Sequence, residues 1–505
     1  MMSTPLDFNA FQKCYDAGQP QILSQTFLAD LDTPVSAYMK LSQDERYAFL
    51  LESVEDGAIK GRYSIIGLRP DVVWRADGGK ASINRDALSG DSFTITSEPA
   101  LDSLRNLLAE SQIDLPRDLP PMAAGIVGYM GYDMVREMEQ LGDAKNNPID
   151  VPSGMFVRPT IMAIFDAVTN NITVVTPVRP SADISAEKAY STAISLAESY
   201  VARLEGPRPR MNVTDLPEAM PQVSSNTSGE RFKEMVETAQ EYILAGDIFQ
   251  VVLSQRFSIP FTLPAFALYR ALRRTNPSPY MYHLAFDDFA VVGSSPEVLV
   301  RLTDGEVTIR PIAGTRKRGS TYAEDQALEQ ELLADPKELS EHLMLLDLGR
   351  NDVGRVAKPG TVKVTQQNTI ERYSHVMHIV SNVVGEIDEK YDAIDALKAG
   401  FPAGTVSGAP KVRAMEIIDE LETDARGPYA GSVGYFSASG TSMDTAIVLR
   451  TAVVKNGVMH VQAGAGIVAD SDPASEQAEC ENKALALVHA AEQAFILAKQ
   501  RHNQD

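Results

Sequence analysis

The sequence predicts an α+β protein built on antiparallel β-sheets. Segments typical of strands and segments typical of helices occur in clusters, without the regular strand–helix alternation of parallel α/β folds. The chain has 505 residues, of which 44 % are hydrophobic and 23 % are charged, as in ordinary globular proteins. A chain of this length is expected to fold into two to three lobes.

The first part of the chain contains strand patterns interleaved with helical ones. Short apolar or alternating runs predict strands at 47–53, 71–79, 159–168 and 171–178. Apolar residues at helical spacing predict helices at 100–111 and 185–206. Residues 205–229 are rich in Pro, Ser, Asn and Thr and have almost no apolar periodicity, which predicts a linker or a long surface excursion. We therefore divide the chain into 1–204, 205–229 and 230–505.

The third part continues the same mixture of elements. Apolar residues from Phe232 to Ile243 fall on one helical face, and a turn at 245–247 leads into a predicted strand at 248–257. A helix at 264–275 is expected to stop at Asn276-Pro277. Further strands are predicted at 290–302, 305–312, 432–440 and 445–454, and further helices at 337–348 and 475–500.

Composition excludes several classes of protein. The net charge of −22, from 46 basic and 68 acidic residues, disfavours binding to nucleic acid. No apolar run approaches the roughly 20 residues of a membrane span, and the first residues do not resemble a secretory signal. Cys14 and Cys480 are too few for a disulfide framework, so the cytoplasm is the expected compartment.

Two helical segments carry paired carboxylates. Glu338 and Glu341 are three residues apart on one predicted helix face, and Glu476, Glu479 and Lys483 share a face of the last helix. Two carboxylates from separate helices are typical of a Mg²⁺ site, because Mg²⁺ prefers oxygen ligands and retains several waters. The alternative, a solvated helix face, is the more common reason for this spacing.

Glycine-rich segments offer backbone donors that could approach an anion. Gly314 and Thr315 lie beside three cations in PIAGTRKRG, and Gly464 and Gly466 lie in AGAGIV. Neither segment is a nucleotide-binding motif, and by spacing alone a turn or bulge is the more common reason for each. No HxH, HExxH, CxxC or GxSxG spacing occurs, so zinc and a serine nucleophile are not expected.

Eight motifs in a fixed order resemble the chorismate-utilising enzyme family. They are GDIFQVVLSQRF, GSSPE, RPIAGTR, ELSEHLMLLDLGRND, FPAGTVSGAPK, AGSVGYF, DTAIVLRT and AGAGIV followed by SEQAECENKA. The resemblance is dense over 230–495 and looser over the first 200 residues. It implies a fold of orthogonally packed antiparallel β-sheets surrounded by helices, with a chorismate-binding catalytic domain at 230–505 and a regulatory site for tryptophan in 1–204.

The resemblance also implies roles for individual residues. The expected Mg²⁺ ligands are Glu341 and Glu479, with Glu338 and Glu476 acting through water. The expected catalytic residues are Glu297, as the acid that protonates the departing C4 hydroxyl, His378, near the ring for the later elimination, and Gln250. The expected substrate-binding residues are Gly314, Thr315, Tyr429, Arg450, Gly464, Ala465, Gly466 and Lys483. The expected regulatory residues, in LLES at 50–53 and NPSPYM at 276–281, are Glu52, Ser53, Pro279, Tyr280 and Met281.

Two positions distinguish branches of this family. Members that add water carry a lysine where this chain has Gln250, and members that form aminodeoxychorismate typically carry a lysine where it has Ala313. Both departures imply direct addition of ammonia at C2 of chorismate, giving anthranilate and pyruvate. The ammonia is expected from a separate glutamine amidotransferase subunit or from solution, since no glutaminase segment is recognised in the sequence. The alternatives are an aminodeoxychorismate-forming component and a catalytically silent subunit that binds tryptophan.

Overall fold

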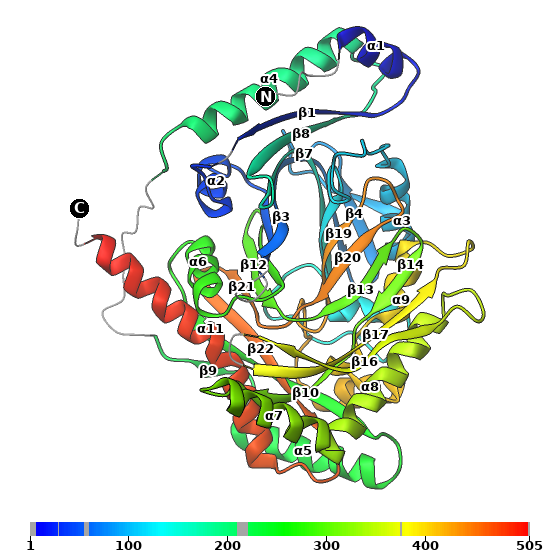
Figure 1. Ribbon diagram of the computed structural model, residues 1–505, viewed down its shortest axis with the longest axis vertical. Helices are drawn as coiled ribbons and strands as arrows, with labels where there is room; N and C mark the ends of the chain where they lie inside the picture. Colours follow the sequence, from blue (N-terminus) through cyan, green and yellow to red (C-terminus); the bar gives the residue numbers. More distant parts are fainter. Residues whose placement is uncertain (1–6, 29, 55–59, 210–220, 374–375, 503–505) are drawn as a thin grey trace.

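The computed structural model describes residues 7–28, 30–54, 60–209, 221–373 and 376–502 (Figure 1). Its helices are α1 Phe8–Asp16, α2 Pro34–Leu41, α3 Ala100–Glu110, α4 Ala186–Glu205, α5 Gly229–Leu244, α6 Ala265–Thr275, α7 Tyr322–Ala334, α8 Pro336–Gly354, α9 Ala393–Gly400, α10 Lys411–Leu421 and α11 Pro473–His502, with 3₁₀ turns η1 Tyr132–Glu137 and η2 Gly404–Val406. Within these ranges no helix combines the length and apolar character needed to cross a bilayer.

The strands occur mostly in runs between these helices. They are β1 Gln21–Leu28, β2 Ala48–Val54, β3 Lys60–Asp77, β4 Lys80–Asn84, β5 Thr94–Pro99, β6 Ile126–Met130, β7 Gly154–Asp166, β8 Asn171–Val178, β9 Ser224–Ser225, β10 Gln250–Pro260, β11 Tyr280–Ala285, β12 Phe289–Ser295, β13 Val298–Thr303, β14 Glu306–Ile309, β15 Ile312–Lys317, β16 Lys363–Arg372, β17 Val376–Glu386, β18 Gly408–Ala409, β19 Ser432–Phe436, β20 Met443–Ile447, β21 Thr451–Lys455 and β22 Val458–Ile467.

The predicted α+β class with antiparallel sheets is confirmed. Each ladder between the strands named above is antiparallel, and the ladders connect them into one hydrogen-bonded network. Strands from the first 204 residues pair with strands from 230–505, since β2 pairs with β11 and β6 pairs with β19. The two ends of the sequence therefore share one sheet framework.

Helices cover the sheets on several sides (Figure 1). The long helix α11 packs against α5, α6 and β22, and α8 packs against β15 and β17. At the opposite end of the molecule, α1 and α4 lie beside β1 and β8 with a small hydrophobic core of their own. The sheet framework and its helices thus bring β10, β15, β17, β22, α8 and α11 together around one region.

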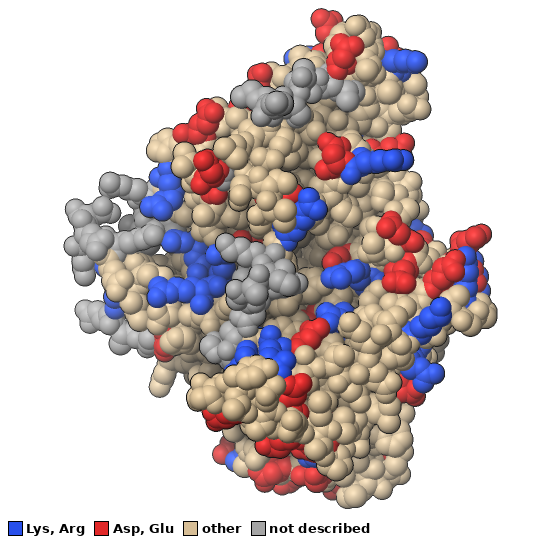
Figure 2. Space-filling view, in the orientation of Figure 1, with Lys and Arg blue, Asp and Glu red and all other residues tan. Residues whose placement is uncertain are grey.

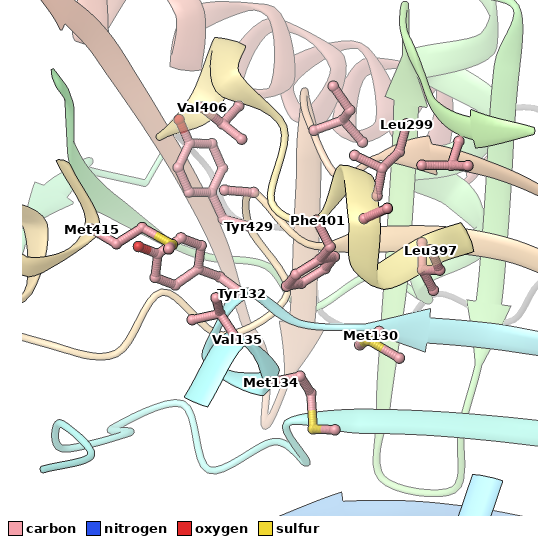
Figure 3. Packing of buried hydrophobic residues seen from close by; sticks show 14 of the residues in the cluster. Met130, Tyr132, Met134, Val135, Leu299, Leu397, Phe401, Val406, Met415 and Tyr429 are labelled. Atoms are coloured by element: carbon pink, nitrogen blue, oxygen red, sulfur yellow. The ribbon is translucent and has the colours of Figure 1, made fainter. Parts of the chain in front are cut away.

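A large hydrophobic cluster supports this region from one side. It joins Met130 and Tyr132 from the first part of the chain to Val406, Met415 and Tyr429 from the last part (Figure 3). Cores packed from residues distant in sequence resist local displacement. The cluster therefore fixes the backbone on which the functional side chains are mounted.

Two predicted strands are interrupted beside Glu297 and Arg450, and a third, 305–312, is interrupted at Arg310–Pro311 between β14 and β15. The predicted strand 290–302 breaks at Pro296–Glu297 between β12 and β13, and the predicted strand 445–454 breaks at Val448–Arg450 between β20 and β21. Arg450 has a φ of 48°, in the left-handed region that strand residues do not adopt. Apolar residues flank the breaks beside Glu297 and Arg450, which favoured continuous strands, although Pro296 was a signal of interruption at the first. Of the predicted excursion 205–229, residues 210–220 lie outside the described residues.

The surface reflects the acidic composition. Figure 2 shows Asp and Glu side chains gathered at the end of the molecule where α5 and α7 lie, whereas Lys and Arg side chains mix with acidic ones near the middle of this face. The net charge of −22 makes the long-range field negative. An anionic ligand therefore needs local cationic groups.

Candidate active site

The residues predicted to act on the substrate line one cavity of about 460 Å³. Those that line it are Gln250, Glu297, Gly314, Thr315, Glu338, Glu341, His378, Tyr429, Arg450, Gly464, Gly466, Glu476, Glu479 and Lys483. Ala465 is the exception, because its methyl group is buried in the large hydrophobic cluster. The structure thus brings together residues that are far apart in the sequence.

The floor of the cavity is the antiparallel pair of β10 and β22. A Cβ atom on Gly464 would come within 2.8 Å of the hydroxyl oxygen of Tyr429. A Cβ atom on Gly466 would come within 2.7 Å of Nε2 of Gln250. At Gly464 the carbonyl oxygen of Leu253, 2.7 Å from such a Cβ, also excludes a side chain, whereas at Gly466 the flexible end of Gln250 would have to move.

The break between β12 and β13 turns Glu297 into the cavity. Burial raises the pKa of its carboxyl from an ordinary value of 4.5 to about 8, because the charged form is poorly solvated there. Hydrogen bonds from the Thr405 hydroxyl, 3.5 Å away, and from the backbone amide of Ile312 act in the opposite direction but are smaller. The carboxyl is therefore protonated at neutral pH, as a general acid must be.

The break between β20 and β21 carries Arg450. Its side chain is half-buried, and loss of hydration lowers its pKa. Across the described ranges, no carboxylate forms an ion pair with it. A half-buried guanidinium without a protein counter-ion favours an anionic ligand, and its planar donor fork matches a carboxylate.

A bulge in β15 orients His378. The register between β15 and β17 shifts between Ala313 and Thr315, where Gly314 adopts a φ of 68°. Nδ1 of His378 lies 3.1 Å from the carbonyl oxygen of Gly314 and 3.0 Å from the hydroxyl of Thr315. Burial lowers the pKa of His378, so the ring is neutral. With its proton on Nδ1 and donated to the Gly314 carbonyl, Nε2 remains available to accept a proton.

Four carboxylates gather on one side of the cavity. Glu338 and Glu341 come from α8, and Glu476 and Glu479 come from α11. Burial raises the pKa of Glu341, and the negative charges of Glu338 and Glu479 raise it further. Burial also raises the pKa of Glu476, with a contribution from Glu479. The cluster therefore holds more negative charge than its surroundings neutralise.

Neighbouring cationic and amide groups bind three of these carboxylates. Arg316 binds Glu338 at 2.9 Å, Lys483 binds Glu479 at 2.7 Å, and Nε2 of Gln250 lies 3.4 Å from Oε1 of Glu341. The described side chains include no group of three or more His, Cys, Asp or Glu arranged around one ion. Mg²⁺ is commonly held by one or two carboxylates together with water, so a carboxylate from each helix fits this ion.

Lys483 and Tyr429 complete the cavity wall. Nζ of Lys483 donates to the carbonyl oxygen of Gly464 at 2.9 Å. The ring of Tyr429 lies near Val406 (Figure 3), with the guanidinium of Arg426 5.6 Å from its centroid. Arg426 is itself buried in an ion pair with Glu422. Tyr429 is therefore held rigidly by packing and by charge.

The residues of the cavity that sequence analysis did not assign include Ile312, Thr405 and Gln462. Ile312 and Thr405 both bond to Glu297, and Gln462 has a buried Oε1 without a hydrogen-bond partner in the described part of the chain. Thr405 lies in the glycine-rich segment 401–411, and this composition could have indicated a residue of the site. Ile312 and Gln462 have no such signal, because they look like ordinary strand residues. Lys411, from the same segment as Thr405, instead pairs with Asp352 at 2.9 Å.

The predicted regulatory residues line a different cavity, of about 610 Å³. The segments 50–53 and 276–281 meet there, since β2 pairs with β11 and Met281 lies opposite Glu52. Glu52 is buried and accepts hydrogen bonds from Arg273, with Nε at 2.7 Å, and from the hydroxyl of Tyr269. The residues that line this cavity include Glu52, Ser53, Pro279, Tyr280 and Met281.

Comparisons with known proteins agree with this geometry. Over nearly its full length the chain is similar to anthranilate synthase component 1 of Cereibacter sphaeroides, with 53 % identity over 98 % of this chain and 99 % of the relative. It is 47 % identical to that of Thermus thermophilus, over 93 % and 97 % of the two chains.

Solved structures show the same architecture. Anthranilate synthase component I from Streptococcus pneumoniae aligns with a TM-score of 0.75 and 37 % identity, covering 92 % of this chain and 99 % of that chain. The menaquinone-specific isochorismate synthase from Escherichia coli shares the fold, with a TM-score of 0.69 at 21 % identity over 96 % and 99 % of the two chains. The model of the chorismate binding enzyme family matches residues 47–489. The chain therefore belongs to the chorismate binding enzyme family.

Proposed function

We propose that this protein is the chorismate-converting component of an anthranilate synthase, a lyase of tryptophan biosynthesis that forms anthranilate and pyruvate from chorismate and ammonia. The observation that carries the proposal is that a protonated acid, Glu297, faces the same cavity as an unpaired arginine, Arg450, and a cluster of four carboxylates. The curated relatives described above carry the name of this enzyme component.

The cavity is suited to a small ligand with two carboxylates. Arg450 binds the pyruvyl carboxylate, and the backbone of Gly314 and Thr315 contacts the ring carboxylate near the acidic cluster. Glu341 and Glu479 are the residues that would hold Mg²⁺, which when bound supplies Lewis acidity toward the ring carboxylate. Without a cation, four carboxylates would repel this end of the substrate. A metal ion held by Glu341 and Glu479 would therefore also reduce this repulsion.

The cavity residues account for the bond changes. Ammonia forms the new C–N bond at C2 while the C4–O bond breaks, and Glu297 delivers its proton to that oxygen, which leaves as water. In the second step C2 loses its proton and the ring loses pyruvate by cleavage of the ether bond at C3. The neutral Nε2 of His378 faces the cavity as an acceptor near the ring. General acid help of the kind Glu297 provides is typically worth about 10²–10⁴ in rate.

The side chains at two positions favour ammonia over the alternatives. Gln250 lines the cavity as an amide, which cannot act as a base toward water, and Ala313 offers no amine for attack on C2. An aminodeoxychorismate-forming component and a silent regulatory subunit are therefore less well supported, and no observation favours either of them.

A partner subunit is part of the proposal. Cys480 is buried and its pKa is raised to about 12, so its thiol stays protonated and cannot serve a glutaminase reaction. Ammonia is therefore supplied by a separate glutamine amidotransferase subunit or taken from solution. The cytoplasm remains the predicted compartment.

Feedback inhibition by tryptophan is proposed for the larger cavity. It combines apolar walls with the buried carboxylate of Glu52 and the hydroxyl of Ser53, which suits a ligand with an aromatic body and a charged end. Pro277 and Pro279 restrict the loop before β11, so little ordering entropy is lost on binding.

Product identification tests the proposed activity. The purified chain is incubated with chorismate, MgCl₂ and an ammonium salt, and the products are separated by chromatography. Anthranilate and pyruvate in equal amounts are expected, together with loss of turnover when Mg²⁺ is chelated. Formation of aminodeoxychorismate or isochorismate in place of anthranilate would assign the chain to another branch, and the absence of any turnover would contradict a catalytic role.

A further inference from the structure

The two cavities described above share a wall. Pro296 and Ile312 line both the catalytic cavity and the larger cavity beside β2 and β11. Glu297 lines the catalytic cavity, whereas its neighbour Val298 lines the larger cavity and not the catalytic one. A single layer of residues therefore separates the proposed regulatory ligand from the proposed general acid.

The first connection runs along the strands. β11 pairs with β12, with Tyr280 opposite Ser295, and the chain continues from Ser295 through Pro296 to Glu297. Tyr280 lines the larger cavity. A ligand that displaces Tyr280 therefore acts on the backbone two residues before Glu297. The ring of Pro296 fixes its φ, so this residue cannot absorb the displacement by rotating about that bond.

The second connection is Ile312, the first residue of β15. Its backbone amide donates a hydrogen bond to the carboxyl of Glu297. Two residues later, the carbonyl oxygen of Gly314 contacts Nδ1 of His378 at 3.1 Å. A shift of Ile312 therefore alters the surroundings of both proposed catalytic side chains.

The third connection is Tyr373, which lines the larger cavity. Its ring packs edge-on against the ring of His378, with centroids 5.5 Å apart and an interplanar angle of 63°. On its other side the hydroxyl donates to Glu371 at 3.0 Å, and Glu371 pairs with Arg310. These contacts hold the Tyr373 ring in place. A displacement of the ring would therefore move the imidazole of His378 that packs against it.

From this geometry we infer that Pro296, Ile312 and Tyr373 form a coupling partition, through which a ligand in the larger cavity displaces Glu297 and His378. The inference rests on the proposed regulation by tryptophan and adds the residues that transmit it. Tryptophan and chorismate then weaken each other's binding by the same factor, since coupling between two sites is reciprocal. Tyr373 is a positioning residue in this scheme, because it acts through His378.

The coupling is measured as the ratio of two tryptophan dissociation constants, with and without saturating chorismate. Calorimetry in Mg²⁺ buffer without ammonia or glutamine avoids formation of the amine product. The expected ratio for the wild type lies in the range of about 5- to 150-fold that is typical of allosteric coupling. Ile312→Ala is expected to reduce the ratio below about threefold while tryptophan still binds in the absence of chorismate.

Ile370→Ala is the matched control. Ile370 lines the larger cavity but not the catalytic one, so the same truncation there should leave the ratio at the wild-type value. Ile312→Val, a smaller truncation, should give an intermediate ratio and provides the test if Ile312→Ala does not fold. Tyr373→Leu should lower kcat with little change in KM, and Tyr373→Phe, which retains the ring, should restore kcat.

The possible outcomes separate the partition from the regulation itself. A wild type that binds no tryptophan overturns both. A wild type that is coupled, together with an Ile312→Ala variant that keeps the same ratio, overturns the partition and leaves the regulation standing. An Ile370→Ala variant that loses coupling as fully as Ile312→Ala also overturns the partition, because the effect would then belong to the cavity as a whole.

Discussion

Replacing Glu297 by Gln changes both the chemistry and the pH dependence of stability. The substitution keeps the shape of the side chain and removes its proton donor. We expect kcat to fall by about 10²–10⁴, the usual contribution of a general acid, with little change in KM for chorismate. The wild type should lose activity as the pH rises through about 8 when free ammonia is held constant, because the carboxyl then loses its proton.

The same substitution has a calculable effect on stability. The pKa of Glu297 is about 8 in the folded chain and 4.5 when it is solvated, so the folded chain binds more protons than the unfolded chain between these values. The free energy of unfolding therefore decreases as the pH rises in this window. Between pH 6 and pH 8 the decrease due to Glu297 is about 2 kcal/mol, and Gln has no such titration.

Scanning calorimetry measures this difference. An unfolding entropy of roughly 2.1 cal/mol/K per residue converts about 2 kcal/mol into about 2 °C for 505 residues. From pH 6 to pH 8, the Tm of the wild type should fall about 2 °C further than that of Glu297→Gln. Glu237→Gln, an exposed change on α5, should follow the wild type. Equal pH dependence in wild type and Glu297→Gln would show that the buried carboxyl is not protonated, and a kcat within tenfold of wild type would remove Glu297 as the acid.

Three further substitutions test the other assignments. Glu479→Gln should keep the circular dichroism spectrum of the wild type and nearly abolish turnover, because it removes one of the charges that would hold Mg²⁺; wild-type rates at limiting Mg²⁺ would exclude it from the metal site. Gln250→Lys should lose anthranilate formation, and some isochorismate or salicylate is expected by chromatography because a partly desolvated lysine can activate water; undiminished anthranilate formation would show that residue 250 does not face the reacting ring. Ser53→Phe should fill part of the larger cavity and raise the tryptophan concentration for half-inhibition while leaving uninhibited turnover largely intact; equal sensitivity in both proteins would make Ser53 merely structural.

Much of the fold could be predicted because the local patterns agree with the final structure. The helical spacing at 185–206 corresponds to α4, and the alternating run at 171–178 corresponds to β8. Ordered motifs also identified residues that meet in the catalytic cavity although they are far apart in the chain. Pattern alone could not have grouped Glu341 with Glu479, because charged residues three or four apart on a helix are usually solvated. Their grouping depends on how α8 and α11 pack, which no local pattern encodes.

The two strand breaks show why the placement of Glu297 and Arg450 could not be predicted from local patterns. Periodicity predicted continuous strands through Glu297 and through Arg450, since the apolar residues on both sides keep the strand pattern. A continuous strand would keep both side chains in the regular alternation of a ladder, with backbone groups paired to neighbouring strands. The breaks release these two residues from the ladder, and burial then leaves one carboxyl protonated and one guanidinium without a counter-ion. Each state costs free energy in the folded protein, which a sequence selected for stability alone would avoid. At these two positions, local prediction fails where the fold holds groups in the states that the proposed binding and proton transfer would require.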